Sequence, residues 1–188
     1  MAADVLDALR ARRSIGKLEG DVSDERIRAL IQAAVWAPNH RLTEPWRFVV
    51  LRGAARERLG RAWGEAAAEK AALRGEEREA VVRREASKLM RAPALIVVAT
   101  RTDADPVVAI EDFAATAAAV QNLLLAAHAL DLGAIWRTGE LAYAPEVKAH
   151  LGLDPADRIV AIVYVGRPGM EPPKGQARES ERNVRWLS

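Results

Sequence analysis

The chain contains no cysteine among its 188 residues. Without thiols it cannot form disulfides, use a thiolate nucleophile or bind a metal through sulfur. Its three histidines, His40, His128 and His150, are too scattered to indicate a pair of metal ligands. We therefore predict no metal site, and any redox chemistry must come from a bound organic cofactor.

An excess of one charge is also lacking, since 28 Lys and Arg residues face 26 Asp and Glu residues, for a net charge of +2. Electrostatic binding of nucleic acid needs a clustered basic excess, so we expect no nucleic-acid partner. The N-terminal sequence MAADVLDALRARRSIG is charged throughout, unlike a signal peptide, and no apolar run is as long as a membrane span. We expect a soluble cytoplasmic protein without a membrane partner.

Several motifs that identify enzyme classes are missing. The chain has no G-x-S-x-G elbow, no Walker loop and no G-x-G-x-x-G fingerprint. The marks of classical hydrolases, P-loop proteins and Rossmann domains are thus absent. Half of the residues are hydrophobic, which is enough to build a core. We predict a single domain over residues 1–188, with an extended C-terminal tail from about residue 167.

Hydrophobic periodicity predicts helices that alternate with strands. Helices are expected at 3–12, from a Ser23 cap to a stop at Pro38, twice within 54–90 with a break near Gly75, at 108–130 ended by Gly133, and at 145–151. Strands are expected at 47–51, 94–100, 134–136 and 159–165. The runs ALIVVAT and IVAIVYV are typical of strands covered on both faces, which predicts helices on both sides of one sheet. The charges within 54–90 are interpreted as a solvated helix face.

Three polar segments at the edges of these elements are candidate binding sites. Arg12, Arg13 and Ser14 follow the first helix, where two guanidinium groups and a hydroxyl could hold a phosphate. The alternative is a basic helix end that complements the helix dipole. The second segment runs from Ala37 through Asn39 and His40 to Trp46, and a structural loop around a buried Trp46 explains it equally well.

The third segment is 133–139, which ends a predicted strand with Trp136, Arg137 and Thr138. An aromatic group, a cation and free backbone amides at a sheet edge suit a flat, electron-poor ring. The alternatives are that Trp136 fills the core and that Arg137 forms a surface ion pair.

Taken in order, these segments resemble the FMN-dependent nitroreductase family. The resemblance rests on the helix followed by Arg-Arg-Ser, on Ala37 to Val50 with its Pro-Trp-Arg-Phe-Val-Val ending, on Gln121-Asn122-Leu123 with Leu132-Gly133, and on Tyr164 to Pro168. It spans nearly the whole chain. The length and the third segment are most similar to the short bacterial NAD(P)H nitroreductases.

The resemblance implies an α+β fold, a three-layer α-β-α sandwich with a mixed, mainly antiparallel sheet. It also implies a homodimer formed through long helices, with an FMN in each of two interface sites. Arg12, Arg13 and Ser14 would hold the phosphate end, and Trp136, Arg137 and Thr138 would line the isoalloxazine. Trp36, Asn39 and His40 would lie by the flavin, some of them from the partner subunit. The nicotinamide cofactor would meet the helix end formed by Ala126, Ala127, His128, Ala129, Leu130 and Asp131.

The implied activity is an NAD(P)H-dependent oxidoreductase that reduces nitroaromatics, quinones or similar small acceptors in a ping-pong cycle. Arg137 would stabilise the reduced flavin, and no side chain is needed as a catalytic acid. The chain has Glu44 where the family has Gln, and it lacks the family's usual Arg-Lys-Pro ending. The alternatives are a dehalogenase or flavin-fragmenting enzyme with the same fold, and a binding module without enzymatic activity.

Overall fold

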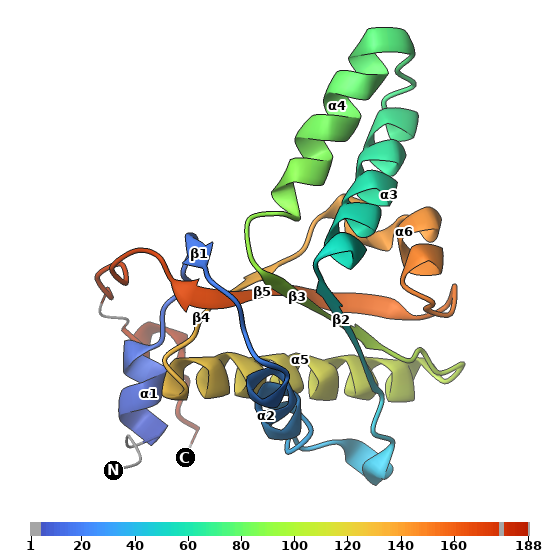
Figure 1. The fold of residues 1–188 in the computed structure, drawn as a ribbon. Helices are drawn as coiled ribbons and strands as arrows, with labels where there is room; N and C mark the ends of the chain where they lie inside the picture. The colour runs from blue at the N-terminus through green and yellow to red at the C-terminus, as the bar shows by residue number, and fades with distance from the viewer. Residues whose placement is uncertain (1–4, 177–178, 188) are drawn as a thin grey trace.

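The computed structural model describes residues 5–176 and 179–187, and its centre is one β-sheet with helices on both faces (Figure 1). The strands are β1 (Leu18–Glu19), β2 (Trp46–Arg52), β3 (Ala94–Thr100), β4 (Gly133–Arg137) and β5 (Arg158–Pro168). Their order is β1-β5-β3-β2, and β4 also pairs with β5. Every pairing among the described strands is antiparallel. The expected mainly antiparallel sheet is confirmed, and its mixed character is not seen in these strands.

The helices form the two outer layers of the sandwich, as predicted. One layer holds α1 (Val5–Ala11), α2 (Asp24–Ala34) and the long α5 (Pro106–Ala129), while the other holds α3 (Ala54–Lys70), α4 (Gly75–Lys88) and α6 (Pro145–His150) (Figure 1). Short 3-10 turns follow at η1 (His40–Leu42), η2 (Glu140–Tyr143) and η3 (Glu181–Asn183). Ser23 caps α2 as expected, because its hydroxyl accepts from the backbone N–H of Arg26 at 3.3 Å.

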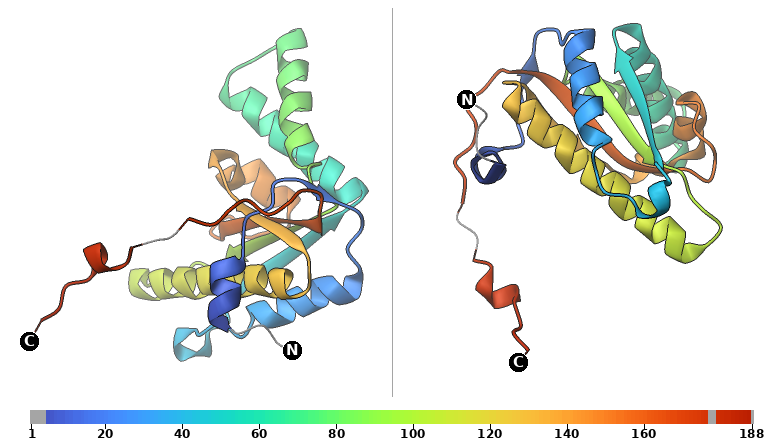
Figure 2. Two further views of the ribbon diagram at one scale, coloured as in Figure 1. Left: turned by 90° about the vertical axis from the view of Figure 1, so that its left-hand side faces the viewer. Right: turned by 90° about the horizontal axis from the view of Figure 1, so that it is seen from below.

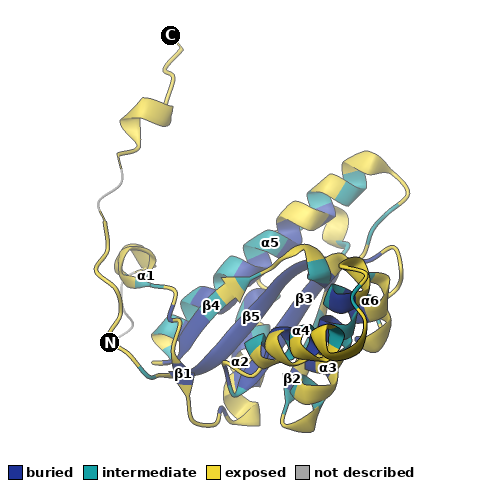
Figure 3. Cartoon of the chain, turned by 90° about the horizontal axis from the view of Figure 1, so that it is seen from above, coloured by how far each residue is buried: buried dark blue, intermediate teal, exposed yellow. Residues whose placement is uncertain are grey.

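The buried strand β3 shows why the layers form on both sides. Its side chains alternate, so that Ile96 and Val98 pack with α2 and α5, whereas Leu95 and Val97 pack with α3 and α6. All seven residues of β3 are buried, as the uninterrupted apolar run indicates. Figure 3 shows the sheet as the buried centre of the molecule.

A β-bulge in β5 changes which side chains face each layer. Val98 pairs with Ala161 and Ala99 pairs with Ile159, so Val160 is an extra residue in β5. Its carbonyl accepts a hydrogen bond from the indole Nε1 of Trp136, at 3.1 Å. The bulge therefore fixes the side chain at the end of β4.

The long helix ends within one residue of the predicted Leu130, but the role expected of Gly133 in stopping it is wrong. The helix ends at Ala129, and Asp131 takes the left-handed position with φ 55°. The backbone N–H of Leu132 donates to Ala127 and that of Asp131 to His128, which is a Schellman closure. Gly133 instead begins β4, where a Cβ would lie 2.6 Å from Leu18 Cδ2. The missing side chain lets the segment after α1 approach the sheet.

Helix α5 is the one described helix whose length and hydropathy would allow it to cross a membrane. Core helices meet the same criterion. Here α5 buries Ala119, Val120 and Leu123 against the sheet, and it carries the buried Asp112. We therefore interpret α5 as the central helix of its layer.

Helices α3 and α4 form a hairpin that projects from the sheet (Figure 1). They approach closely at two glycines: a Cβ on Gly64 would lie 2.5 Å from the Val82 carbonyl oxygen, and one on Gly60 would lie 3.0 Å from that of Ala86. Most of the charges are exposed, as interpreted, but Glu85 is only 7% exposed. Its burial is explained by Arg84 and Lys88, which both bind its carboxylate.

The segment after β5 is exposed and runs away from the body of the molecule (Figures 2 and 3). It begins beside the N-terminal segment, because the Arg13 Nε donates to the carbonyl of Pro173 at 3.2 Å. Trp186, near its end, is 84% exposed.

Candidate functional site

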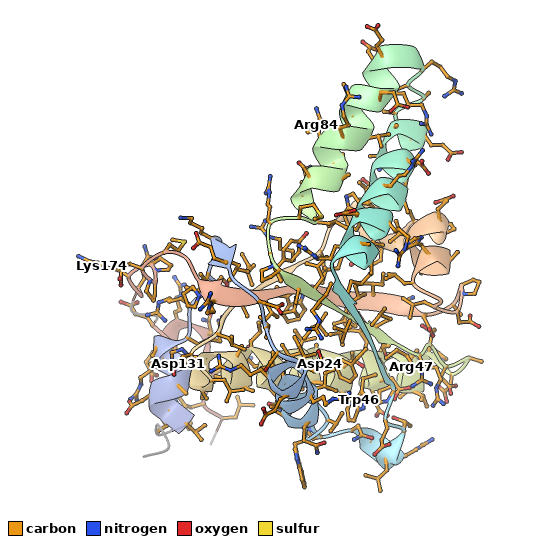
Figure 4. The ribbon with its side chains drawn as sticks, viewed as in Figure 1. Asp24, Trp46, Arg47, Arg84, Asp131 and Lys174 are labelled. Carbon is orange, nitrogen blue, oxygen red and sulfur yellow. The ribbon has the colours of Figure 1, made fainter. Side chains whose placement is uncertain are left out.

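The segment after α1 lies against the start of β4 and the end of α5. The Ile15 N–H donates to the carbonyl of Ala134 at 3.1 Å, which fixes this segment at the sheet edge. A cavity of about 220 Å³, here called the N-terminal cavity, lies beside it. Its polar lining consists of Arg12, Arg13, His128 and Asp131. Figure 4 shows Asp131 at the end of α5 beside α1. The fold thus brings together two candidate groups that are more than 100 positions apart.

The residues of these two groups differ in burial and in their hydrogen bonds. Arg13 donates to three backbone carbonyls, those of Arg10 at 2.6 Å, Arg12 at 2.9 Å and Pro173 at 3.2 Å. It therefore fastens the C-terminal segment to the N-terminal one. Ser14 is exposed, Ala127 is fully buried, and Ala126 and Leu130 pack against the core. Ala129 is exposed.

A second cavity, of about 440 Å³, lies between the end of β4 and the α3–α4 hairpin, and we call it the β4 cavity. From the sheet side come Arg137, Thr138 and Tyr164, and the hairpin side adds an aromatic and several charged groups. The hairpin residues are Trp63, Glu85, Lys88, Leu89 and Arg91. The Arg137 guanidinium carbon lies 5.6 Å from the centre of the Tyr164 ring. Its Nε is buried and has no hydrogen-bond partner among the described residues.

The charges around the β4 cavity leave it positive. Glu85 binds Lys88 and Arg84, and Glu140 forms an ion pair with Lys70. Arg91 and Arg137 also line the cavity, and neither forms an ion pair with a described residue. An anionic or electron-rich ligand would complement these two guanidinium groups.

Two ionisable groups in the β4 cavity show the effect of burial. Burial raises the pKa of Tyr164, and the nearby Arg137 and Arg91 oppose the rise. For Glu85, burial also acts to raise the pKa, but the hydrogen bonds and charges of Lys88 and Arg84 outweigh it, so that its pKa is lowered. Glu85 therefore stays ionised and holds the two cations of α4 in place.

The predicted trio at the end of β4 is divided between the two faces of the sheet. Arg137 points into the β4 cavity, with Tyr164. Trp136 shares the face of Ala134, which packs in the α2 and α5 layer, because side chains alternate along a strand. Trp136 is 38% exposed, and Thr138 is exposed at the cavity edge.

The third candidate group lies elsewhere. Trp36 is 79% exposed just after α2, and His40 is exposed in η1. The Asn39 side chain accepts from the Glu44 N–H at 3.0 Å. Thr43 of this loop bonds to Asp112 on α5. Asp112 lies sixteen residues before His128 on the same helix, so at 1.5 Å per residue these two residues are about 24 Å apart along α5. One chain therefore does not bring Asn39 and His40 to the end of α5.

Sequence reasoning missed several residues of the β4 cavity. The charge pattern of α4 indicates only a solvated face, and the sequence around Tyr164 indicates only a strand. Glu85 and Lys88 stand three positions apart, as partners on one helix face do, and this spacing was an available signal. The approach of Tyr164 to Arg137 depends on strand register, which no local pattern indicates.

Fold and site together define a three-layer α+β sandwich with basic cavities along its edge strand β4. The chain belongs to the nitroreductase family, whose sequence model matches residues 9–167. It is 32% identical over 169 residues to the Bacillus subtilis protein named "Putative NAD(P)H nitroreductase YfhC", covering 88% of this chain and 85% of that one.

Solved structures agree with this membership. The nitroreductase-like family protein from Bacillus cereus superimposes with a TM-score of 0.88 at 29% identity, covering 100% of this chain and 97% of that one. A Desulfovibrio desulfuricans structure, titled as a "putative nitroreductase in complex with fmn", has a TM-score of 0.73 at 29% identity and covers 100% of this chain and 99% of that one. The chain is thus an oxidoreductase-family protein with the nitroreductase fold.

Proposed function

We propose that the protein binds FMN and uses NAD(P)H to reduce a small acceptor such as a nitroaromatic or a quinone, in two-electron ping-pong cycles. Family membership and the FMN named in the Desulfovibrio structure support this proposal. The observation that carries it is the position of Arg137, whose Nε is buried beside an aromatic ring and has no hydrogen-bond partner in the part of the chain that the structure describes. A buried donor of this kind calls for an acceptor, and the polar edge of a flavin ring offers several.

Bound FMN would supply the redox chemistry, taking hydride from NAD(P)H and passing electrons to the acceptor. Arg137 would hold positive charge beside the ring edge and so favour the reduced form. Arg12, Arg13 and Ser14 would hold the phosphate, with Arg13 also fastening the C-terminal segment. The end of α5 would contact the nicotinamide cofactor through His128 and Asp131, which line the N-terminal cavity.

The homodimer is part of the same proposal, because Trp36, Asn39 and His40 need a second subunit to reach a flavin held at the other end of α5. Large apolar side chains are exposed around η1 and the first half of α5: Trp36 is 79%, Leu42 81%, Val107 62% and Ile110 72% exposed. Light scattering should give twice the chain mass of 20.5 kDa. Ile110→Glu should shift the protein to the monomer, and a monomeric wild type would contradict the shared site.

A cytoplasmic location also belongs to this proposal. The main alternative is another flavoenzyme of the same fold, such as a dehalogenase or a flavin-fragmenting enzyme, since fold alone does not fix the reaction. The compound that reoxidises the reduced flavin distinguishes these enzymes. A binding module without enzymatic activity would be colourless and would bind its partner with a steep salt dependence.

Titration with FMN and with riboflavin tests the proposed contacts. Wild type should bind FMN on the order of tenfold or more tightly than riboflavin, because only FMN has a phosphate for charge-assisted hydrogen bonds. Arg12→Ala should reduce this difference, since Arg13 and Ser14 would remain beside the phosphate. Arg137→Met should weaken both ligands equally, since its contact is to the ring. A wild type that binds neither ligand would refute the proposal.

A further inference from the structure

The loop 39–44 has an unfavourable backbone. Three of its residues, Arg41, Leu42 and Glu44, have φ values of 56°, 53° and 44°. These lie in the left-handed region that non-glycine residues rarely adopt, and none of the three is Asn or Asp. Such a conformation persists only where surrounding contacts impose it, and strained segments of this kind concentrate at functional sites.

One side-chain hydrogen bond from outside the loop holds it against α5. The Thr43 hydroxyl donates to Asp112 Oδ1 at 2.6 Å, which joins the loop to α5. Inside the loop, the Asn39 side chain accepts from the Glu44 N–H and the His40 carbonyl accepts from the Thr43 N–H. Among the described residues, the Thr43–Asp112 bond is the side-chain hydrogen bond that connects residues 39–44 to another helix.

If Asp112 only filled space in the core, an apolar side chain at this position would stabilise the fold more. It is 2% exposed, and its second oxygen, Oδ2, is buried without a hydrogen-bond partner among the described residues. A buried carboxylate with an unsatisfied oxygen makes the folded protein less stable than an apolar side chain of similar size would. Since α5 is otherwise rich in Ala and Leu, the carboxylate needs another purpose, and the contact it makes is with the loop.

We propose that Asp112 and Thr43 are positioning residues that hold the loop 39–44, with Asn39 and His40, in the shape that completes the flavin site of a second subunit. The inference rests on the proposed function for the flavin itself. It assigns a purpose to two residues that need not touch the cofactor.

The test compares four variants of the full-length protein. Thr43→Val removes the hydroxyl at nearly constant volume, and Thr43→Ser keeps it. The matched control is Thr116→Val, because the fully buried Thr116 hydroxyl also bonds to Asp112, but to its backbone carbonyl at 2.9 Å. Asp112→Asn is a fourth variant, which keeps an acceptor oxygen and removes the charge in case Thr43→Val does not fold.

Two measurements distinguish the effect on the loop from the effect on FMN binding. Without FMN, trypsin should cleave after the exposed Arg41 on the order of tenfold faster in Thr43→Val than in wild type, as loss of one bond to a charged group implies. With FMN, the dissociation constant should rise by a similar factor. Thr43→Ser should restore both values, Thr116→Val should change neither, and Asp112→Asn should give a smaller change in the same direction.

Equal cleavage and equal FMN affinity in Thr43→Val and Thr116→Val would overturn the inference. Faster cleavage with unchanged FMN affinity would also overturn it, because the loop would then have no part in the site. If wild type does not bind FMN, the proposed function is wrong, and so is the part of this inference that concerns the flavin site. The cleavage rates then decide on their own whether Asp112 holds the loop.

Discussion

Replacement of Gly64 by Ala tests the close contact of α3 with α4, which places Glu85, Lys88 and Arg91 beside the β4 cavity. The added Cβ would lie 2.5 Å from the Val82 carbonyl oxygen and 2.8 Å from its Cα. Ordinary carbon contacts are about 3.5–4.0 Å, so α4 must move by roughly 1 Å. Such overpacking costs about 1–3 kcal/mol, and the better helix propensity of Ala returns about 1 kcal/mol.

We therefore expect Gly64→Ala to lower the free energy of unfolding by up to about 2 kcal/mol, measured by urea denaturation of the protein without FMN. Gly60→Ala should cost less, since its Cβ would meet the Ala86 oxygen at 3.0 Å. Gly16→Ala is the control, because no atom lies within 4 Å of its Cβ position. If Gly64→Ala is as stable as Gly16→Ala, the two helices do not pack as closely as described.

Two further predictions concern ionisation in the β4 cavity. The pKa of Glu85 is below its usual 4.5, so its contribution to stability is present above that value and is lost as the pH falls through the lower pKa. The stability difference between wild type and Glu85→Gln, from urea denaturation, should shrink as the solution is acidified below pH 4.5; a constant difference would mean that the carboxylate is not held ionised. The pKa of Tyr164 is above 10.0, and Arg137 opposes this rise, so in an alkaline absorbance titration Arg137→Met should move the late tyrosine to still higher pH. No movement would place the guanidinium away from the ring.

The layers of the fold were predictable because their signals are local. The apolar run 94–100 gave β3 with its observed bounds, and helical periodicity located α2 and α5. The closing strand is longer than the predicted 159–165, because Arg167 and Pro168 pair with the two-residue β1. So short a strand has no periodicity of its own, and its existence depends on the partner.

The site was only partly predictable. Arg12, Arg13 and the end of α5 do meet in one cavity, although nothing local in the sequence says so. The division of Trp136 from Arg137 follows from strand alternation and could have been foreseen once β4 was extended to Arg137. The β4 cavity could not be predicted, because Arg91 and Tyr164 line it from elements that only tertiary packing brings together.

The absorption spectrum of the purified protein with added FMN, recorded without oxygen before and after addition of NADH or NADPH, tests the central proposal most directly. We predict a yellow complex whose visible absorbance bleaches on addition of the nicotinamide and returns when a quinone or nitroaromatic is supplied. A protein that stays colourless after exposure to FMN, or a yellow complex that neither nicotinamide bleaches, would contradict an NAD(P)H-dependent flavin oxidoreductase.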